Sequence, residues 1–337
     1  MSGAGRIVMA HGGGGEATRL LLEERIVSKL GNPILDPLTD GAVLHPPDGP
    51  ICFTTDSYVV RPLEFPGGDI GRLAVCGTVN DLAVMGARPL ALSLGLILEE
   101  GLPFDLLDRI VDGVAAAAEE AGVPIVTGDT KVIERRGDDG MLINTAGVGT
   151  LREDARLGAA RVEPGDALLI SGRIAEHGLA VLSVRENLAF DTDIRSDAAP
   201  LYGLVDRLLG SGADVRFLRD PTRSGLAGVL ADLAEETGFA LEVEEEAIPI
   251  TAAVLHTADL LGLDPLTIAN EGKVVAVVAG ADAPRALEAL RSHPLGRRAA
   301  VIGRVTESEP PLVELLTRGG GRRLVQRPYG EDLPRIC

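Results

Sequence analysis

Two successive blocks of alternating strand and helix patterns constrain the fold of this chain more than any other feature. The first block has strand patterns at 51–60, 89–98, 123–127 and 141–150, and helical patterns at 70–83 and 104–121. The helical pattern at 104–121 is the clearest, because its apolar residues recur every three or four positions. Strands that alternate with helices in this way are typical of an α/β domain.

A break at 151–164, where charged residues and glycine replace the periodic pattern, separates the two blocks. The second block has strand patterns at 167–171, 239–243, 273–279 and 300–305, and helical patterns at 178–188, 200–209 and 225–237. This order predicts a second α/β domain of similar size, because 337 residues exceed what one hydrophobic core usually organises.

The expected organisation has four parts. Residues 1–45 form a glycine-rich segment with a short helix, 46–155 the N-terminal domain and 160–312 the C-terminal α/β domain. Residues 313–337 form a flexible tail with one short strand and then irregular chain, and the tail ends at Cys337. A thiol at this place is either a stray surface cysteine or a chemical handle on a mobile peptide.

The charge balance excludes some classes of function. The chain has 50 acidic and 32 basic residues, a formal net charge of -18, which argues against an extended nucleic-acid interface. No apolar run is long enough to span a bilayer, and the three cysteines lack the spacing of a disulfide framework. We therefore expect a cytoplasmic protein that binds neither nucleic acid nor membrane.

Polar side chains interrupt apolar segments at three places in the first domain. Asp56 lies inside a strand pattern, Asn80 and Asp81 interrupt an apolar helix, and Asp129 stands at the end of another strand pattern. A buried ionised carboxylate is costly unless a cation or hydrogen bonds compensate it, so these residues are expected to converge on a cation. All-oxygen ligands favour magnesium, which bridges carboxylates and nucleotide phosphates. Each residue alone could equally be a helix cap or a turn residue.

Three further charged motifs are candidates for the same site. Lys131 follows Asp129 by two positions, where it could neutralise a transferring phosphoryl group or simply lie on the surface. The motif at 219–225 precedes a helix, so its amides and two arginines could hold an anion. Glu271 could be a general base if it is partly desolvated, because burial raises the pKa of a carboxyl group. The alternative for the last two motifs is turn chemistry with charged rims.

A glycine run follows His11 and precedes the first helical pattern. It lacks the lysine and hydroxyl residue that end a P-loop, and it does not follow a strand pattern. The run is either a flexible leader or a lid whose amides close over an anion, and the sequence leaves both open.

Several of these motifs together, in this order, closely resemble the HypE family of hydrogenase maturation proteins. They are TTDSYVV (54–60), FPGGDIGRLAVCGTVNDLAVMGARPL (65–90), VPIVTGDTKV (123–132), INTAGVG (143–149), RDPTRSGLA (219–227), ANEGK (269–273) and LPRIC (333–337). The resemblance implies the two-domain fold of the aminoimidazole ribonucleotide synthetase and selenophosphate synthetase superfamily. In that fold the N-terminal domains of a homodimer form a β-barrel, and ATP binds in the cleft beside the C-terminal α/β domain.

The same resemblance implies an activity and partners. The family carries out the ATP-dependent dehydration of a carbamoyl group on its C-terminal cysteine to a thiocyanate, which supplies cyanide for the iron of NiFe hydrogenase. The implied carbamoyl donor is the carbamoyltransferase HypF, and the implied cyanide acceptor is the HypC–HypD complex.

Site roles follow from the resemblance by matching motifs. Cys337 would be the acceptor thiol, Lys131 would lie at the γ-phosphate or the amide oxygen, and Glu271 would lie near the reacting tail. The remaining residues would hold ATP and Mg²⁺: Asp56, Asp81, Asp129 and Asp220 as metal and ATP ligands, Asn80 as a helper, and His11, Gly12, Gly13 and Gly14 as a loop over the phosphates. Ser224 departs from the family pattern, which has a glycine there, and this puts the local backbone approach in question.

Two alternatives remain at this point. The chain could be a small-molecule kinase or ligase of the same superfamily with an incidental tail, or a non-catalytic carrier of the carbamoyl or cyanide group. The sequence also leaves open whether the tail acts in its own protomer or in a partner.

Overall fold

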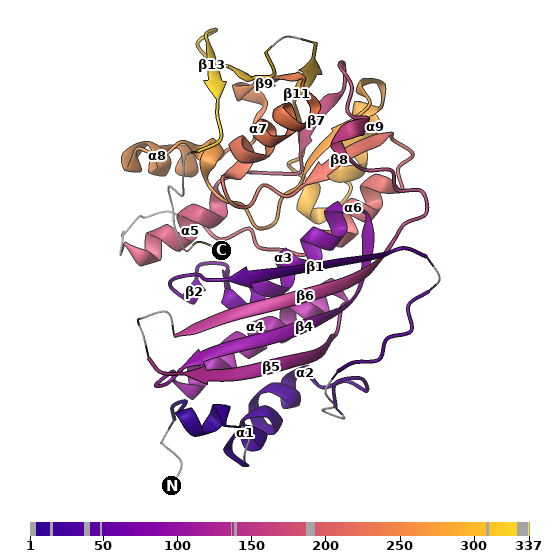
Figure 1. The fold of residues 1–337 in the computed structure, drawn as a ribbon. Helices are drawn as coiled ribbons and strands as arrows, with labels where there is room; N and C mark the ends of the chain where they lie inside the picture. Colours follow the sequence, from indigo (N-terminus) through magenta and orange to yellow (C-terminus); the bar gives the residue numbers. More distant parts are fainter. Residues whose placement is uncertain are drawn as a thin grey trace.

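The computed structural model describes residues 5–13, 16–36, 41–47, 49–135, 137, 140–186, 193–307, 310–328 and 336. These residues form two stacked units, each with its own sheet (Figure 1). Cys337 and Gly14 lie outside the described residues. Within the described ranges, no helix has both the length and the apolar character needed to cross a membrane.

The sheet of the first unit has the strand order β1-β6-β4-β5. Its strands are β1 (Ile51–Tyr58), β6 (Met141–Leu151), β4 (Ala87–Glu99) and β5 (Ile125–Ile133). β6 is antiparallel to both of its neighbours, and β5 runs parallel to β4. In Figure 1, β1 lies next to the second unit and β5 lies at the far edge.

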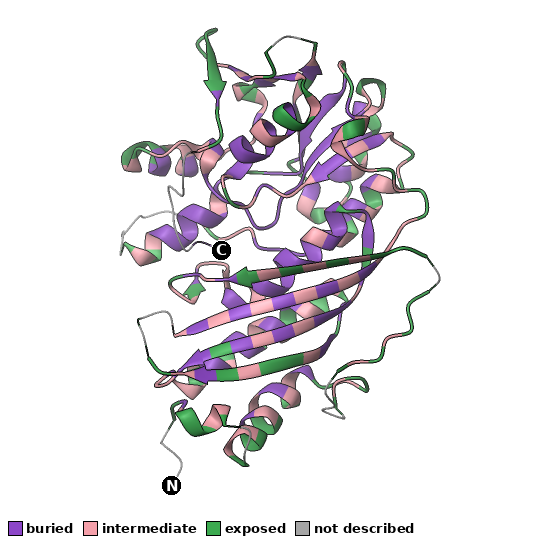
Figure 2. Ribbon diagram, viewed as in Figure 1, coloured by how far each residue is buried: buried purple, intermediate pink, exposed green. Residues whose placement is uncertain are grey.

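Helices cover one face of this sheet. They are α3 (Ile70–Val84) and α4 (Phe104–Ala121), while η1 (Met9–Gly12), α1 (Glu16–Leu21), the π-helical η2 (Leu22–Val27) and α2 (Ser28–Leu30) lie near β5 (Figure 1). No described helix covers the opposite face, which we call the bare face. Ile51 and Phe53 of β1 are 54% and 67% exposed there, an unusual place for large apolar side chains (Figure 2).

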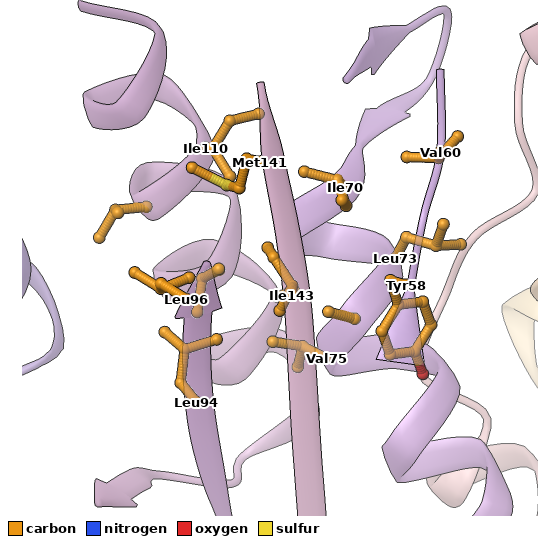
Figure 3. Close-up of a cluster of buried hydrophobic side chains, with 14 of the residues drawn as sticks. Tyr58, Val60, Ile70, Leu73, Val75, Leu94, Leu96, Ile110, Met141 and Ile143 are labelled. Atoms are coloured by element: carbon orange, nitrogen blue, oxygen red, sulfur yellow. The ribbon is translucent and has the colours of Figure 1, made fainter. Parts of the chain in front are cut away.

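The core of the first unit is built from aliphatic side chains between the sheet and its helices. Ile110 of α4 lies on the side of Leu96 of β4, whereas Ile70 and Leu73 of α3 lie on the other side of Ile143, toward Tyr58 and Val60 (Figure 3). Each such side chain contributes about 1.5–3 kcal/mol when it is fully buried. The periodic apolar residues at 104–121 therefore predicted both the helix and its buried face.

The second unit contains a sheet with the order β13-β12-β9-β11-β7-β10-β8. Its strands are β7 (Ala167–Ile170), β8 (Val215–Arg219), β9 (Ala240–Glu244), β10 (Val275–Val278), β11 (Ala300–Thr306), β12 (Val313–Leu316) and β13 (Arg322–Val325). Its helices are α5 (Glu176–Arg185), α6 (Tyr202–Leu209), α7 (Gly225–Thr237), α8 (Ala252–Leu261) and α9 (Ala283–Arg291). The strand pairs are antiparallel except β12 with β9, so the unit is α+β in its pairing.

The predicted tail is partly incorporated into the fold. β12 and β13 extend the second sheet within residues 313–325, where the sequence predicted one strand and irregular chain. The reason is that β9 would otherwise leave an unpaired edge, which β12 covers in parallel register. Ile336, the residue before the terminal cysteine, is only 3% exposed.

A polar cluster joins the two units. The side-chain amide of Asn80 in α3 donates to the carbonyls of Ala199 (3.1 Å) and Glu271 (3.2 Å), and its oxygen accepts from the Leu201 amide (2.7 Å). Asp197 accepts from the amides of Glu271 and Gly272 in the same place. The segment 269–273 is therefore held from both units.

We predict that Gly272→Ala destabilises the protein. A Cβ atom at this position would lie 1.8 Å from the backbone oxygen of Asp197, a clash that only a backbone shift could relieve. We expect the free energy of unfolding in urea to fall by at least about 2 kcal/mol. Gly319→Ala is the matched control, because a Cβ there meets nothing within 4 Å, and an equal loss in both variants would contradict the packing argument.

Candidate active site

A hollow of about 190 Å³ lies where β1 and α3 of the first unit meet the second unit. Its lining includes Asp56, Asp81, Asp220, Arg223 and Glu271. Asp56 comes from β1 and Asp81 from α3, whereas Asp220 and Arg223 follow β8 and Glu271 precedes β10. The fold thus brings together four of the predicted carboxylates from four separate segments.

Short-range contacts orient the two carboxylates of the first unit. The Thr54 hydroxyl donates to Asp81 Oδ2 (2.9 Å), and the Ser57 amide donates to Asp56 Oδ1 (2.8 Å). Arg223 Nη2 lies 3.8 Å from Asp56 Oδ1, so a guanidinium group from the second unit faces the same carboxylate.

The carboxylates of the hollow repel one another. Burial, and then the charge of Asp56, raise the pKa of Asp81. Removal from water, followed by the charge of Asp81, raises the pKa of Asp220 to about 7. A cation would relieve this repulsion, and the oxygen donors suit Mg²⁺.

The hollow is nevertheless not a complete metal cage. No three His, Cys, Asp or Glu side chains among the described residues are close enough to hold a metal ion together. A magnesium ion would therefore need further oxygen ligands, which a nucleotide phosphate and water can supply.

Glu271 is 3% exposed and is positioned through its backbone. Its amide donates to Asp197 Oδ1 (3.1 Å), and its carbonyl accepts from Asn80. Glu271 is one of the residues that line the hollow. Its position is desolvated, the condition on which the sequence made it a candidate general base, and that role stays a prediction.

Asp129 and Lys131 do not reach this hollow within one protomer. Both lie inside β5, not at a strand end as the sequence predicted, because the β4–β5 pairing continues to Ile133. β6 and β4 separate β5 from β1 in the sheet. Both residues are exposed, and their pairing with Gly95 and Ile97 directs them to the bare face.

The described start of the glycine run, at Gly12, lies beside β5 and is not part of the lining of the hollow. A Cβ at Gly12 would lie 2.7 Å from the Val132 amide nitrogen, so this turn packs closely on β5. His11 Nδ1 accepts from the Val8 amide (2.9 Å), and its ring meets Phe104 edge-on at 5.3 Å. His11, Gly12 and Gly13 therefore belong to the β5 edge.

Asn80 has a positioning role. It is 1% exposed, its side chain is used in the hydrogen bonds that join the units, and it is absent from the lining of the hollow. The expectation that it helps to hold ATP stays a prediction, and the structure adds that its side chain joins the two units. An asparagine in an apolar helix signals a buried polar contact, but the sequence does not reveal the partner.

Ser224 precedes α7 with a left-handed backbone conformation. Its φ is +66°, in the region that costs a non-glycine residue roughly 1–2 kcal/mol. Glycine enters this region without that cost, so a glycine would suit the position.

The buried pair Asp197–Lys273 was not identified from the sequence. Lys273 Nζ lies 2.7 Å from Asp197 Oδ2, with the two side chains 10% and 3% exposed. A lysine directly before the apolar run at 274–278 was the available signal, because a buried ammonium group requires an anionic partner.

Family models place both units in one class. The model for the N-terminal domain of AIR synthase related proteins matches residues 38–151, and the model for their C-terminal domain matches 163–313. The chain therefore has the two-domain architecture of the AIR synthase related proteins.

Similarity to individual proteins identifies one family within this class. Carbamoyl dehydratase HypE of Azotobacter vinelandii is 49% identical over 333 residues, which cover 99% of this chain and 98% of the relative. The crystal structure of HypE in complex with ATP is 46% identical, covers 98% of this chain and 99% of its own, and has a TM-score of 0.93. A HypE–HypF complex structure matches at 47% identity and a TM-score of 0.80, covering 91% of this chain and 99% of its own. The chain belongs to the HypE family of carbamoyl dehydratases, enzymes of hydrogenase maturation.

We predict that Asp220 makes stability depend on pH. In the folded chain its carboxyl group keeps its proton up to about pH 7, whereas the unfolded chain releases it near the ordinary pKa of 3.8. The folded state therefore binds more protons between these values, and stability falls as pH rises through this window.

Asp220→Asn should accordingly be more stable than the native chain at about pH 8, and the difference should shrink by about pH 5, in urea denaturation at both values. The exposed Asp105→Asn serves as the control. A larger advantage at the lower pH would contradict the assignment.

Proposed function

We propose that this protein uses ATP and Mg²⁺ to dehydrate a carbamoyl group on its own Cys337 to a thiocyanate. The observation that carries the proposal is the position of the preceding residue. Ile336 is buried in the same cluster as Ala198 and Ala269, next to the segment that carries Glu271. Ile336 also contacts His177, whose neighbour Gly178 donates its amide to the carbonyl of Ala269, so the last described residue lies close to this segment.

The residues of the hollow suit ATP and magnesium. Asp56, Asp81 and Asp220 would hold Mg²⁺, and Arg223 would face phosphate oxygens as a fork of donors. When bound, ATP supplies a phosphoryl group that makes the amide oxygen a better leaving group. The net change removes one water from the S-carbamoyl group: its oxygen leaves with phosphate and two protons leave its nitrogen. Glu271 is the buried carboxylate placed to accept a proton there.

The partners follow from the family relationship. A relative of this chain has been crystallised as a HypE–HypF complex. This complex supports HypF as the carbamoyl donor for Cys337 of this chain. Delivery of cyanide to the iron of NiFe hydrogenase through HypC–HypD, and a cytoplasmic location, remain predictions of the resemblance.

The separation of Asp129 and Lys131 from the hollow favours a site shared between two copies. These residues lie on the bare face, where Ile51 and Phe53 are also exposed. A second copy on this face would bury the apolar side chains, and among the described residues neither outer strand, β1 or β5, pairs with a further strand. We infer that the two sheets close into a barrel, and that Asp129, Lys131 and the glycine turn of each protomer complete the hollow of the other.

Mixed dimers test this arrangement. Asp81→Asn and Lys131→Ala should each lower the dehydration rate about 100-fold, because each removes charge stabilisation of phosphoryl transfer. Chains of both variants, coexpressed, should regain about a quarter of the native rate, since half of the dimers are mixed and each has one intact site. Equal inactivity of the mixture and the single variants would show that both groups act within one protomer.

The activity itself is tested on the intact protein. We incubate the native chain with the carbamoyltransferase, carbamoyl phosphate and ATP. Cys337 should gain a carbamoyl group, which should then lose one water. Mass spectrometry of the C-terminal peptide measures both changes in mass. Cys337→Ala should fold normally and yield no product, because the chain end contributes one residue beyond Ile336.

The outcomes separate the alternatives. A stable carbamoyl mass without dehydration in the presence of ATP would indicate a carrier. A small-molecule kinase or ligase would give two different results. The native tail would stay unmodified, and Cys337→Ala would turn over a soluble substrate with ATP as fast as the native chain does.

A further inference from the structure

One buried histidine contacts the chain end. His177, the second residue of α5, is 0% exposed, and its Nε2 lies 3.0 Å from the backbone oxygen of Ile336. Its Nδ1 lies 2.8 Å from the Ser196 hydroxyl. The ring of Phe65 meets the imidazole edge-on at 5.4 Å.

The protonation state follows from these partners. A backbone oxygen only accepts hydrogen bonds, so Nε2 must carry a proton and donate to Ile336. Burial lowers the pKa of His177, so the ring is neutral and Nδ1 accepts from the Ser196 hydroxyl. Ser196 Oγ in turn accepts from the Ala198 amide (3.1 Å). The ring therefore has one orientation, with its only donor aimed at the tail.

The start of α5 is tied to the segment that carries Glu271. The Gly178 amide donates to the Ala269 carbonyl (3.2 Å), and the Ala175 amide donates to Asn270 Oδ1 (2.7 Å). Ala175 has a φ of +69°, a strained conformation that this hydrogen bond helps to hold. Any shift of the wall of the hollow is therefore transmitted to the imidazole.

We propose that His177 is a positioning residue, which holds the backbone oxygen of Ile336 so that the next residue reaches Glu271. Consecutive Cα atoms are about 3.8 Å apart, so fixing residue 336 confines the reactive thiol to a small volume. The apolar cluster around Ile336 adds selectivity for a tail that ends in an aliphatic residue followed by cysteine. The inference rests on the proposed function of the tail.

A purely structural role would not need this contact. The sheets and helices of both units are complete before the last residues, and chain ends are usually poorly ordered unless something holds them. Withdrawal of the tail leaves the Nε2 proton without its partner in a fully buried place, which favours the docked state.

The test measures docking of the tail separately from catalysis, in the full-length protein. The first readout is the rate at which carboxypeptidase Y removes the C-terminal residues, measured from the intact mass of the protein over time. The second is ATP-dependent dehydration of the carbamoylated chain. The variants are His177→Ala and His177→Gln, whose amide nitrogen can replace Nε2 as donor, with the exposed His256→Ala as the control from the same unit.

His177→Ala should release the C-terminal residues about five- to tenfold faster, the effect of one lost buried hydrogen bond. Its kcat for dehydration should fall by a similar factor at an unchanged KM for ATP. His177→Gln should recover most of both effects, and His256→Ala should match the native chain. Unchanged release of the tail by His177→Ala, or failure of His177→Gln to recover, would overturn the proposal.

A variant at the chain end guards against misfolding. Ile336→Ala alters only the penultimate residue, and it should accelerate release of the tail as His177→Ala does. Because Ile336→Ala keeps the backbone oxygen that His177 holds, the double variant should release the tail faster than either single variant, by up to the product of the two effects. Release of the tail at the native rate by Ile336→Ala would contradict docking of residue 336. If the native chain showed no dehydration, the proposed function would fail while the release assay still tested docking.

Discussion

The buried ion pair between Lys273 and Asp197 is the contact on which the cleft depends. Burial alone would raise the pKa of Asp197, but the adjacent Lys273 ammonium keeps it below its ordinary value. The same carboxylate accepts from the amides of Glu271 and Gly272, so one ionised side chain organises three consecutive residues. Loss of one partner from a buried pair typically costs about 3–5 kcal/mol, so this segment is held firmly.

The acidic hollow next to this pair shows the opposite electrostatic arrangement. Burial raises the pKa values of Asp81 and Asp220, and a neighbouring carboxylate adds to it, Asp56 for Asp81 and Asp81 for Asp220. Such raised pKa values lower the stability of the protein without a bound cation. Charges arranged in this way favour binding of a cation, and Arg223 at the same place favours an anion. Magnesium with a nucleotide phosphate offers both charges together.

The β5 edge shows that residues predicted as one site can lie in two separate places of one chain. Asp129, Lys131 and the His11 turn lie together, but two strands separate them from Asp56. Asp129 and Lys131 lie on the bare face, as do the exposed Ile51 and Phe53, so completion of the site and pairing of two copies concern the same surface. The hydrogen bond between His177 and the backbone oxygen of Ile336 connects the chain end to α5.

The sequence by itself determined the local elements and the chemical groups. Apolar periodicity predicted α4 and α7 to the residue, polar residues in apolar segments marked Asp56 and Asp81, and the charged motif at 269–273 marked Glu271. Only the tertiary structure decided which groups meet, that Asn80 joins the units, and that Asp197 pairs with Lys273. The physical reason is that periodicity reports which face of an element is buried, whereas partners distant in sequence depend on strand order and on the packing of the two units.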